Sequence, residues 1–189
     1  MLSILIPTLV DRKPFLDQLL NKLTRISQPY KHLIEIVVEC DNYEKTTGEK
    51  RNILADKANG KYSCFIDDDD DVPIWYFDSI FKVLQSDSTI DCIGFKGLII
   101  TEGRKGRQMD VFRHSVGLPY SEGKVNGEYL RPPNHLNPML TDYFRQIRFP
   151  DLTFAEDFSF CNRLAEAKLI KNEKFLDIIM YHYKYRPQK

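Results

Sequence analysis

Apolar and polar residues follow two rhythms along the first half of the chain, and these predict alternating strands and helices. Continuous apolar runs rich in β-branched or aromatic residues are typical of buried parallel strands. They occupy residues 2–6, 33–40 and 61–66. Apolar positions at helical spacing predict a helix over 13–26, and residues 48–58 resemble a shorter helix stopped by Gly60. A third helix is expected from Pro73 to about Gln85, since proline suits a first helical turn.

This order of elements favours an α/β fold, with a mostly parallel central sheet covered by helices on both faces. Ligands of such folds bind outside the carboxyl ends of the strands. The sequence places Thr8, Asp41 and the aspartates 67–71 directly after three predicted strands. We therefore expect these side chains to meet in one ligand cleft.

The second half of the chain is less regular, and no repeat, low-complexity linker or clear boundary separates it from the first. Its expected elements are a hairpin over 89–101 and 103–115, loops and short strands over 117–138, a helix over 155–168 and a strand over 174–185. The interpretation is a single domain over residues 1–189.

Composition and charge limit the classes of partner. The 189 residues suit one domain, and a hydrophobic fraction of 42% favours a globular protein. Lys plus Arg and Asp plus Glu each number 27, so the net charge is 27 − 27 = 0. A neutral chain gives no reason to expect a nucleic acid or an anionic membrane as its partner. Four basic residues of the predicted hairpin are interpreted as solvated surface: Arg104, Lys105, Arg107 and Arg113.

Cysteine usage and the N-terminal stretch indicate the compartment. The four cysteines are widely spaced and form no CxxC pair, which favours a reducing compartment over a zinc site or a disulfide framework. The apolar stretch at the N-terminus is too short to span a bilayer and follows no basic segment. We expect a cytoplasmic protein without a transmembrane segment.

The five aspartates after the third strand have two interpretations. Runs of aspartate commonly form solvated loops, and Asp71 would also suit a helix N-cap before Pro73. At the edge of a buried sheet, however, crowded carboxylates raise one another's pKa unless a cation neutralises them. Carboxylate oxygens suit Mg²⁺ or Mn²⁺, which are commonly held by one or two carboxylates together with phosphate oxygens. The run therefore predicts a metal-bound phosphate.

Four segments in order along the chain carry a resemblance to a known family. They are "ILIPTLVDR", "EIVVECDN", "GEKRNILADKANGKYSCFIDDDD" and "FAEDFSFCNRL". The third contains a strand followed by acids that resembles the DXD motif of GT-A fold glycosyltransferases, and the ordered set resembles glycosyltransferase family 2 over nearly the whole chain. The resemblance implies a GT-A (Rossmann-like) domain. Residues 1–90 would bind nucleotide sugar and metal, and residues 91–189 would form a smaller mixed acceptor-side region with the catalytic base.

The resemblance assigns the donor nucleotide to the first half of the chain. Thr8 would lie at the donor site, and Asp41 would accept a hydrogen bond from the base and favour a uridine-type nucleotide. Lys50 or Arg51 would lie near the base or the diphosphate. From the residues alone, Asp41 could instead form a turn, and the two basic residues could be the exposed face of a short helix.

The metal ligands follow from the DXD match. Asp67 or Asp68 would contact the ribose or the metal, and Asp69 would be the main ligand of Mn²⁺ or Mg²⁺. His182 is a candidate third ligand, because neutral imidazole can bind metals, although on an aromatic strand it could equally be a packed histidine. The last two aspartates of the run lie past the matching positions and are expected to cap or to remain solvated.

The catalytic base is assigned by the fourth segment. Asp157 would take the proton from an acceptor hydroxyl in an inverting sugar transfer, and Glu156 would orient the site or the acceptor. Taken alone, this pair would also suit the acidic first turn of a helix. His135 could reach the diphosphate or the acceptor, or could satisfy backbone groups of its loop.

The resulting hypothesis is a metal-dependent hexosyltransferase that moves a sugar from a nucleotide-diphosphate sugar to a glycan or another hydroxyl acceptor. A Mg²⁺-dependent nucleotidyl- or phosphotransferase is the alternative enzyme, although no Gly-rich phosphate loop is present. A non-catalytic module that binds nucleotide sugars is the alternative outside enzymes.

Overall fold

The computed structural model describes residues 1–103 and 106–185, and Arg104 and Lys105 of the predicted hairpin lie outside them. The first half alternates strands and helices as expected. Its elements are β1 (Leu2–Leu9), α1 (Lys13–Ile26), β2 (Ile34–Asp41), α2 (Thr47–Lys57), β3 (Tyr62–Phe65) and α3 (Tyr76–Ser86), with short 3-10 turns at Val10–Arg12 and Gln28–Tyr30.

The second half contains a long hairpin, several short strands and two helices. Its elements are β4 (Cys92–Gly103), β5 (Gly106–His114), β6 (Lys124–Val125), β7 (Glu128–Arg131), β8 (Met139–Leu140), α4 (Thr141–Ile147), α5 (Glu156–Ala167) and β9 (Glu173–Tyr185). The seven-residue helix α4 was not predicted, because so short a segment carries little periodic signal.

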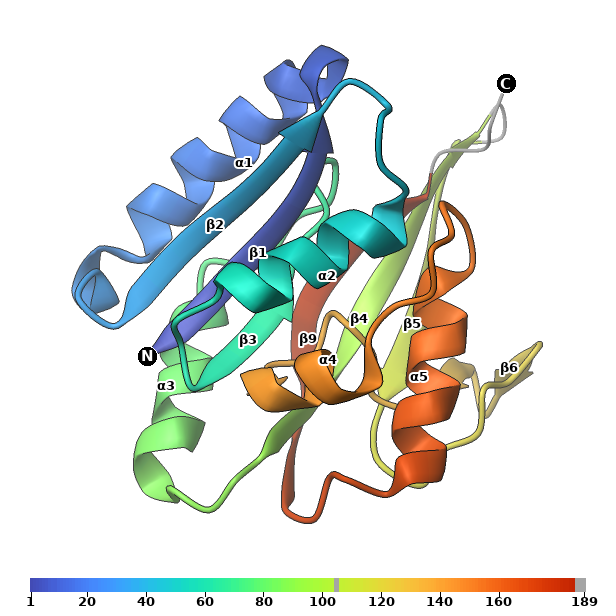
Figure 1. Cartoon of the computed structure of the whole chain (residues 1–189). Coiled ribbons are helices and arrows are strands. Elements are labelled where there is room, and N and C mark those ends of the chain that lie inside the picture. The colour runs from blue at the N-terminus through green and yellow to red at the C-terminus, as the bar shows by residue number, and fades with distance from the viewer. Residues whose placement is uncertain (104–105, 186–189) are drawn as a thin grey trace.

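Across the described residues, nine strands form one sheet in the order β2-β1-β3-β8-β4-β5-β7-β6, with β9 paired to β4. The strands β1, β2 and β3 are parallel, whereas the part beyond them mixes both directions. Figure 1 shows β4, β5 and β9 running together toward the C-terminal end of the chain. The predicted α/β class, with a parallel first half and a mixed second half, is therefore confirmed.

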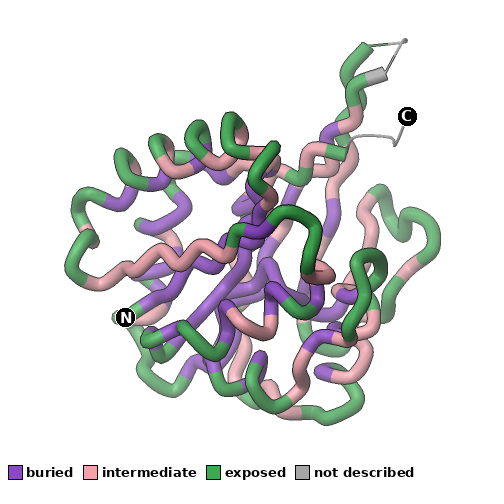
Figure 2. Tube along the Cα trace, turned by 45° about the horizontal axis from the view of Figure 1, so that its top comes forward, coloured by how far each residue is buried: buried purple, intermediate pink, exposed green. Residues whose placement is uncertain are grey.

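Helices cover both faces of the sheet, because alternate residues of each strand point to opposite sides. On one face, Ile4 and Cys64 pack with residues of α1 and α3, such as Leu23 and Phe77. On the other face, Leu5, Phe65 and residues of α2, α4 and α5 form a second cluster. Figure 2 shows the central strands buried between these layers. Two apolar cores thus fix the strand ends that carry the predicted site residues.

In the first half of the chain, the largest differences from the predicted bounds are at the end of β1 and at the start of α3. β1 continues through Pro7 to Leu9, since β3 ends opposite Leu5 and no second neighbour needs the missing proline N–H. α3 begins at Tyr76 rather than Pro73, and Ile74, expected on its apolar face, is 68% exposed.

Within residues 1–103 and 106–185, no helix combines the length and the apolar character needed to cross a bilayer.

Candidate functional site

A cleft of about 620 Å³ opens at the carboxyl ends of β1 and β3 and extends to the N-terminus of α5. One group of lining residues, which we call the charged wall, consists of Arg12, Lys50, Arg51, Asp67, Asp68 and Asp69. A second group, which we call the aromatic wall, consists of Tyr120, Arg131, Phe154 and Tyr183. Thr8, His135, Glu156 and Asp157 also line the cleft. Most of the predicted site residues are thus brought together from segments far apart in the sequence.

Lys50 links the ends of β1 and β2. Its ammonium donates to Asp41 at 2.8 Å and to the carbonyl of Thr8 at 3.1 Å, and both Lys50 and Asp41 are buried. Burial opposes the charge on Asp41, but hydrogen bonds from Lys50 and from the backbone of Lys45 outweigh it and lower the pKa of Asp41. Asp41 lies behind Lys50 and is not part of the cleft lining.

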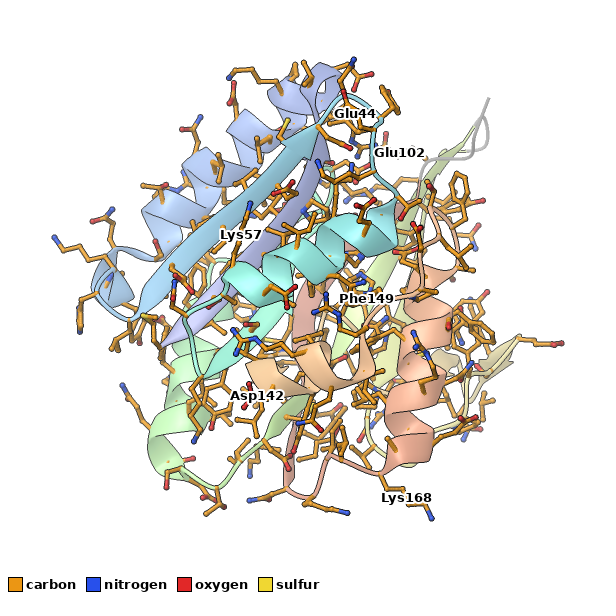
Figure 3. The ribbon with its side chains drawn as sticks, viewed as in Figure 1. Glu44, Lys57, Glu102, Asp142, Phe149 and Lys168 are labelled. Carbon is orange, nitrogen blue, oxygen red and sulfur yellow. The ribbon has the colours of Figure 1, made fainter. Side chains whose placement is uncertain are left out.

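Arg51, a member of the charged wall, is buried. The alternative that it belongs to the exposed face of a short helix is therefore wrong. Its Nε lies 3.1 Å from Glu156 and its Nη2 lies 3.0 Å from Asp67. The guanidinium stacks near the rings of Phe65 and Phe149, at 5.2 and 5.9 Å. Phe149, labelled in Figure 3, lies among the side chains between α2, α4 and α5, where it stacks on Phe160 at 4.3 Å. Arg51 therefore ties the aspartate run to the start of α5.

The surroundings of Asp67 change its pKa. Removal from water opposes its negative charge, but the neighbouring Arg51 outweighs burial, and the pKa of Asp67 falls below its ordinary value. Its Oδ1 is buried and accepts no hydrogen bond from the described residues. The Oδ1 of Asp67 thus faces the positive charge of Arg51 at 3.0 Å and keeps unused hydrogen-bonding capacity.

Arg12 holds the next two aspartates and was not singled out by the sequence analysis. Its Nε donates to Asp68 at 2.9 Å, and its Nη2 lies 2.9 Å from Asp69. Asp68 also accepts a hydrogen bond from Thr8 at 2.6 Å and is buried. Burial opposes the charge on Arg12, yet these aspartates raise its pKa. A basic residue just after the first strand was the available signal, because its strand end adjoins that of the aspartates.

The last two aspartates of the run do not have the roles expected of them. Asp70 is buried, where it accepts hydrogen bonds from the hydroxyl of Tyr181 and the backbone N–H of Lys184, both at 2.8 Å. Burial and the charge of Asp67 raise the pKa of Asp70 well above its ordinary value. Asp71 pairs with Lys22 of α1 and caps no helix, because α3 begins five residues later.

The donor set of the cleft fits a metal ion that shares its ligands with phosphate. Within residues 1–103 and 106–185, no three His, Cys, Asp or Glu side chains are grouped so as to hold a metal. Asp67 and Asp69 do line the same cleft, and Asp67 has a buried oxygen that accepts no hydrogen bond from the described residues. Mg²⁺ commonly uses one or two carboxylates and completes its shell with water and substrate phosphates. These carboxylates would fit a cation whose remaining ligands come from water or from a bound phosphate.

Glu156 and Asp157 begin α5, after Ala155 in the left-handed conformation with φ of 60°. Glu156 is buried against Arg51, whereas Asp157 faces the cleft and its Oδ1 accepts the backbone N–H of Phe158 at 2.8 Å. The N-terminus of a helix stabilises both carboxylates. Glu156 is thus held in place by Arg51, whereas its neighbour Asp157 is open to a ligand.

The two candidate histidines lie in different places. His135 is buried, lines the cleft, and neither of its ring nitrogens has a hydrogen-bond partner among the described residues. Its Nε2 is 3.8 Å from Asp67. His182 pairs through its backbone with Asp71, and its Nδ1 is 4.0 Å from that carboxylate, outside the cleft lining. His135 is therefore available to a ligand in the cleft, and metal binding by His182 stays a prediction.

The aromatic wall comes from loops and strands of the second half. Tyr120 and Phe154 are 41% and 69% exposed, and the ring of Tyr120 lies 4.7 Å from that of Phe158. Tyr183 projects from β9, where burial followed by the charge of Asp70 raises its pKa. No sequence pattern had indicated Tyr120 or Arg131.

No protein-family model and no curated protein matches the chain, but solved structures do. S. aureus TarS 1–349 in complex with UDP superposes with a TM-score of 0.67 at 18% identity, over 98% of this chain and 61% of that chain. The complex of TarS 1–349 with UDP-GlcNAc gives 0.64 at 15% identity, over 100% and 59%. The chain has a GT-A fold.

The match has a defined extent. The chain spans about three fifths of the TarS 1–349 chains, and 37% of the longer S. aureus TarS chain, on which it superposes with a TM-score of 0.62 at 15% identity. At such identities the likeness establishes the GT-A fold and its strand order. The chemistry of this chain depends on the residues of its own cleft.

Proposed function

We propose that the chain is a metal-dependent glycosyltransferase of family 2 that transfers a sugar from a nucleotide-diphosphate sugar to an acceptor hydroxyl. The observation that carries the proposal is the meeting of Asp67, Asp69 and Asp157 in one cleft of a GT-A fold. The complexes of TarS with UDP and UDP-GlcNAc support a UDP-type donor.

The charged wall would bind the donor. The base would lie by Asp41, which Lys50 holds in its ionised form at the end of β2. Asp67 and Asp69 would hold Mn²⁺ or Mg²⁺, which supplies positive charge to the diphosphate as it leaves. His135, with both ring nitrogens unpartnered within the described residues, would meet the diphosphate or the acceptor.

The N-terminus of α5 would deprotonate the acceptor. Asp157 would accept the proton of the acceptor hydroxyl as that oxygen attacks the anomeric carbon on the face opposite the diphosphate, which gives inversion. Glu156 would keep this helix end in place through Arg51, which it contacts at 3.1 Å. The same arginine contacts Asp67, so one side chain would hold the donor and acceptor ends of the cleft in register.

Donor and metal binding can be tested without an acceptor. UDP with Mn²⁺ should raise the melting temperature by linkage, and Asp69→Ala should abolish the part of the shift that requires Mn²⁺. Asp142→Ala, which removes an exposed carboxylate of α4 labelled in Figure 3, is the matched control and should keep the shift. An unchanged Mn²⁺-dependent shift in Asp69→Ala would remove Asp69 from the metal site.

Turnover tests the candidate base. With UDP-GlcNAc, Asp157→Asn should keep the affinity for UDP but lower the rate of UDP release about 10²- to 10⁴-fold, because a positioned general base contributes about that much. Release at the wild-type rate would exclude Asp157 as the base. Binding of UDP sugars without any turnover by the wild type, across a panel of sugars and acceptors, would indicate a binding module instead.

A further inference from the structure

The aromatic wall contains a cation of a different kind from those of the charged wall. Lys50 pairs with Asp41, Arg12 with Asp68 and Asp69, and Arg51 with Asp67 and Glu156. Arg131 lines the same cleft, yet no carboxylate of the described residues lies within 4.0 Å of its guanidinium. A lining arginine without an acidic partner leaves its positive charge available to a ligand.

The guanidinium of Arg131 is nevertheless held in place. Its Nη1 donates to the carbonyl oxygens of Ser121 and Leu130, the latter at 2.8 Å. Its central carbon lies 3.8 Å from the ring centroid of Tyr120, which fixes the plane of the group. Its Nε and Nη2 donate no hydrogen bond to any described residue. One edge of a planar fork is therefore fixed, and the opposite edge has two unused donors.

Such an edge has a specific chemical preference. Two parallel N–H donors of an arginine match the two oxygens of a carboxylate or phosphate, which lysine or a neutral donor matches less well. An arginine that is already oriented by stacking and by backbone acceptors loses less conformational freedom on binding. The geometry favours an anionic group on the ligand.

Arg131 lies toward the acceptor end of the cleft. Its stacking partner Tyr120 contacts Phe158, which directly follows Asp157. Burial and then the charge of Asp157 raise the pKa of Cys161 to about 12, against a lowering effect of Arg131, so both charges lie near this one thiol. Through Tyr120 and Phe158, Arg131 thus lies near the start of α5, and no hydrogen bond or ion pair among the described residues joins it to Asp67 or Asp68.

On the basis of the proposed function, we propose that Arg131, stacked on Tyr120, forms a subsite for an anionic acceptor. This acceptor presents a carboxylate or a phosphate next to the hydroxyl that Asp157 deprotonates. The carboxylate would belong to a uronic-acid residue and the phosphate to a phosphorylated sugar. Neutral acceptors would lack the partner of this arginine.

Three matched probes test the subsite on the protein saturated with UDP and Mn²⁺. They are the p-nitrophenyl β-glycosides of glucose, of glucuronic acid and of glucose 6-phosphate, which differ only at C6. Calorimetry should give about 10- to 100-fold tighter binding of at least one anionic probe than of the neutral one, since a charge-assisted hydrogen-bond pair is worth about that factor. Which anionic probe binds tighter distinguishes the two sources.

Variants separate recognition from a structural role. Arg131→Gln should remove the preference and Arg131→Lys should keep only part of it, because a point charge replaces the fork. Arg113→Gln removes a stacked arginine that is paired with Glu128 away from the cleft, and it should leave the preference intact. If Arg131 only anchors the Ser121 loop, its replacement lowers affinity for all three probes equally, and the proposal fails.

Other results would also overturn the proposal. Equal affinity of the wild type for neutral and anionic probes excludes the subsite even if no Arg131 variant folds. A loss of UDP affinity in Arg131→Gln that matches the loss for the probes places the arginine on the donor instead. If UDP with Mn²⁺ does not bind the wild type, the proposed function fails and the subsite with it. Bound UDP with no preference among the probes refutes the subsite alone.

Discussion

The charged wall and the aromatic wall of the cleft present polar chemistry to a ligand in opposite ways. On the charged wall, Arg12, Lys50 and Arg51 are each committed to a carboxylate of the protein. On the aromatic wall, Arg131 stacks on the exposed ring of Tyr120, and the described residues supply it with no carboxylate. In one cleft, a charged side chain is thus either held by an ion pair, or oriented by stacking and backbone acceptors without a carboxylate partner.

Two ion pairs of the charged wall, Lys50 with Asp41 and Arg51 with Glu156, are buried on both sides. An unpaired charge in this position would lose its hydration without compensation. An exposed aromatic ring loses little when it has no partner. Changes on the two walls should therefore differ in their cost to stability, and the following expectations run from the largest effect to the smallest.

Arg51→Met should destabilise the fold most. It leaves Asp67 and the buried Glu156 without their shared cation, and breaking a buried pair costs about 3–5 kcal/mol. Lys57→Met, which removes an exposed lysine of the same helix paired with Glu39, should cost less than about 1 kcal/mol. Urea unfolding of both variants measures the difference. Equal costs would show that the charged wall is no more than a solvated surface.

His114 makes the stability of the fold depend on pH. It lines the cleft but is buried against Phe95 and Phe112, and burial lowers its pKa from 6.5 to about 3 despite the hydrogen bond to Asn137. Below pH 6.5 the imidazole of His114 is protonated in the unfolded chain, whereas in the folded chain it stays neutral down to about pH 3. The stability from this group is thus present above pH 6.5 and is lost as the pH falls from 6.5 toward 3, by up to about 1.4 kcal/mol per unit.

Denaturant titrations between pH 7 and pH 5 can isolate this contribution. His114→Gln keeps a polar group near Asn137 but does not titrate, so its stability should fall less steeply with acid than that of the wild type. Parallel curves for the two proteins would contradict a neutral, buried His114.

Phe154→Ala should have the smallest effect on stability. The side chain is 69% exposed, so its removal should change the free energy of unfolding by less than about 0.5 kcal/mol. If the aromatic wall binds acceptors, the same change should raise the acceptor KM several-fold and leave UDP affinity unaltered. A large loss of stability would instead make Phe154 part of the fold.

The sequence predicted the parallel half of the fold well. Periodicity placed α1 at its observed bounds, and strand ends placed Thr8 and residues 67–70 at one cleft, although Asp41 and Asp71, expected there too, do not line it. These features are local, because they depend on apolar spacing and on where each strand stops. The helix α4 and the short strands β6, β7 and β8 have too few residues to leave such a pattern.

The five aspartates show where local information ends. Asp67 is held by Arg51 of α2, Asp68 and Asp69 by Arg12 after β1, Asp70 by Tyr181 of β9 and Asp71 by Lys22 of α1. Identical neighbours in sequence thus have different partners and different exposure, because every partner comes from another element. No spacing within the run could have separated them.

By itself, the sequence determined the α/β order, the GT-A resemblance and the acids at the strand ends, since these follow from side-chain type and period. The tertiary structure alone decided which acids are neutralised, which stays open beside α5, and that Arg131 stacks on Tyr120 with an unused edge. The physical reason is that burial and ion pairing depend on distances between segments that are joined only by folding.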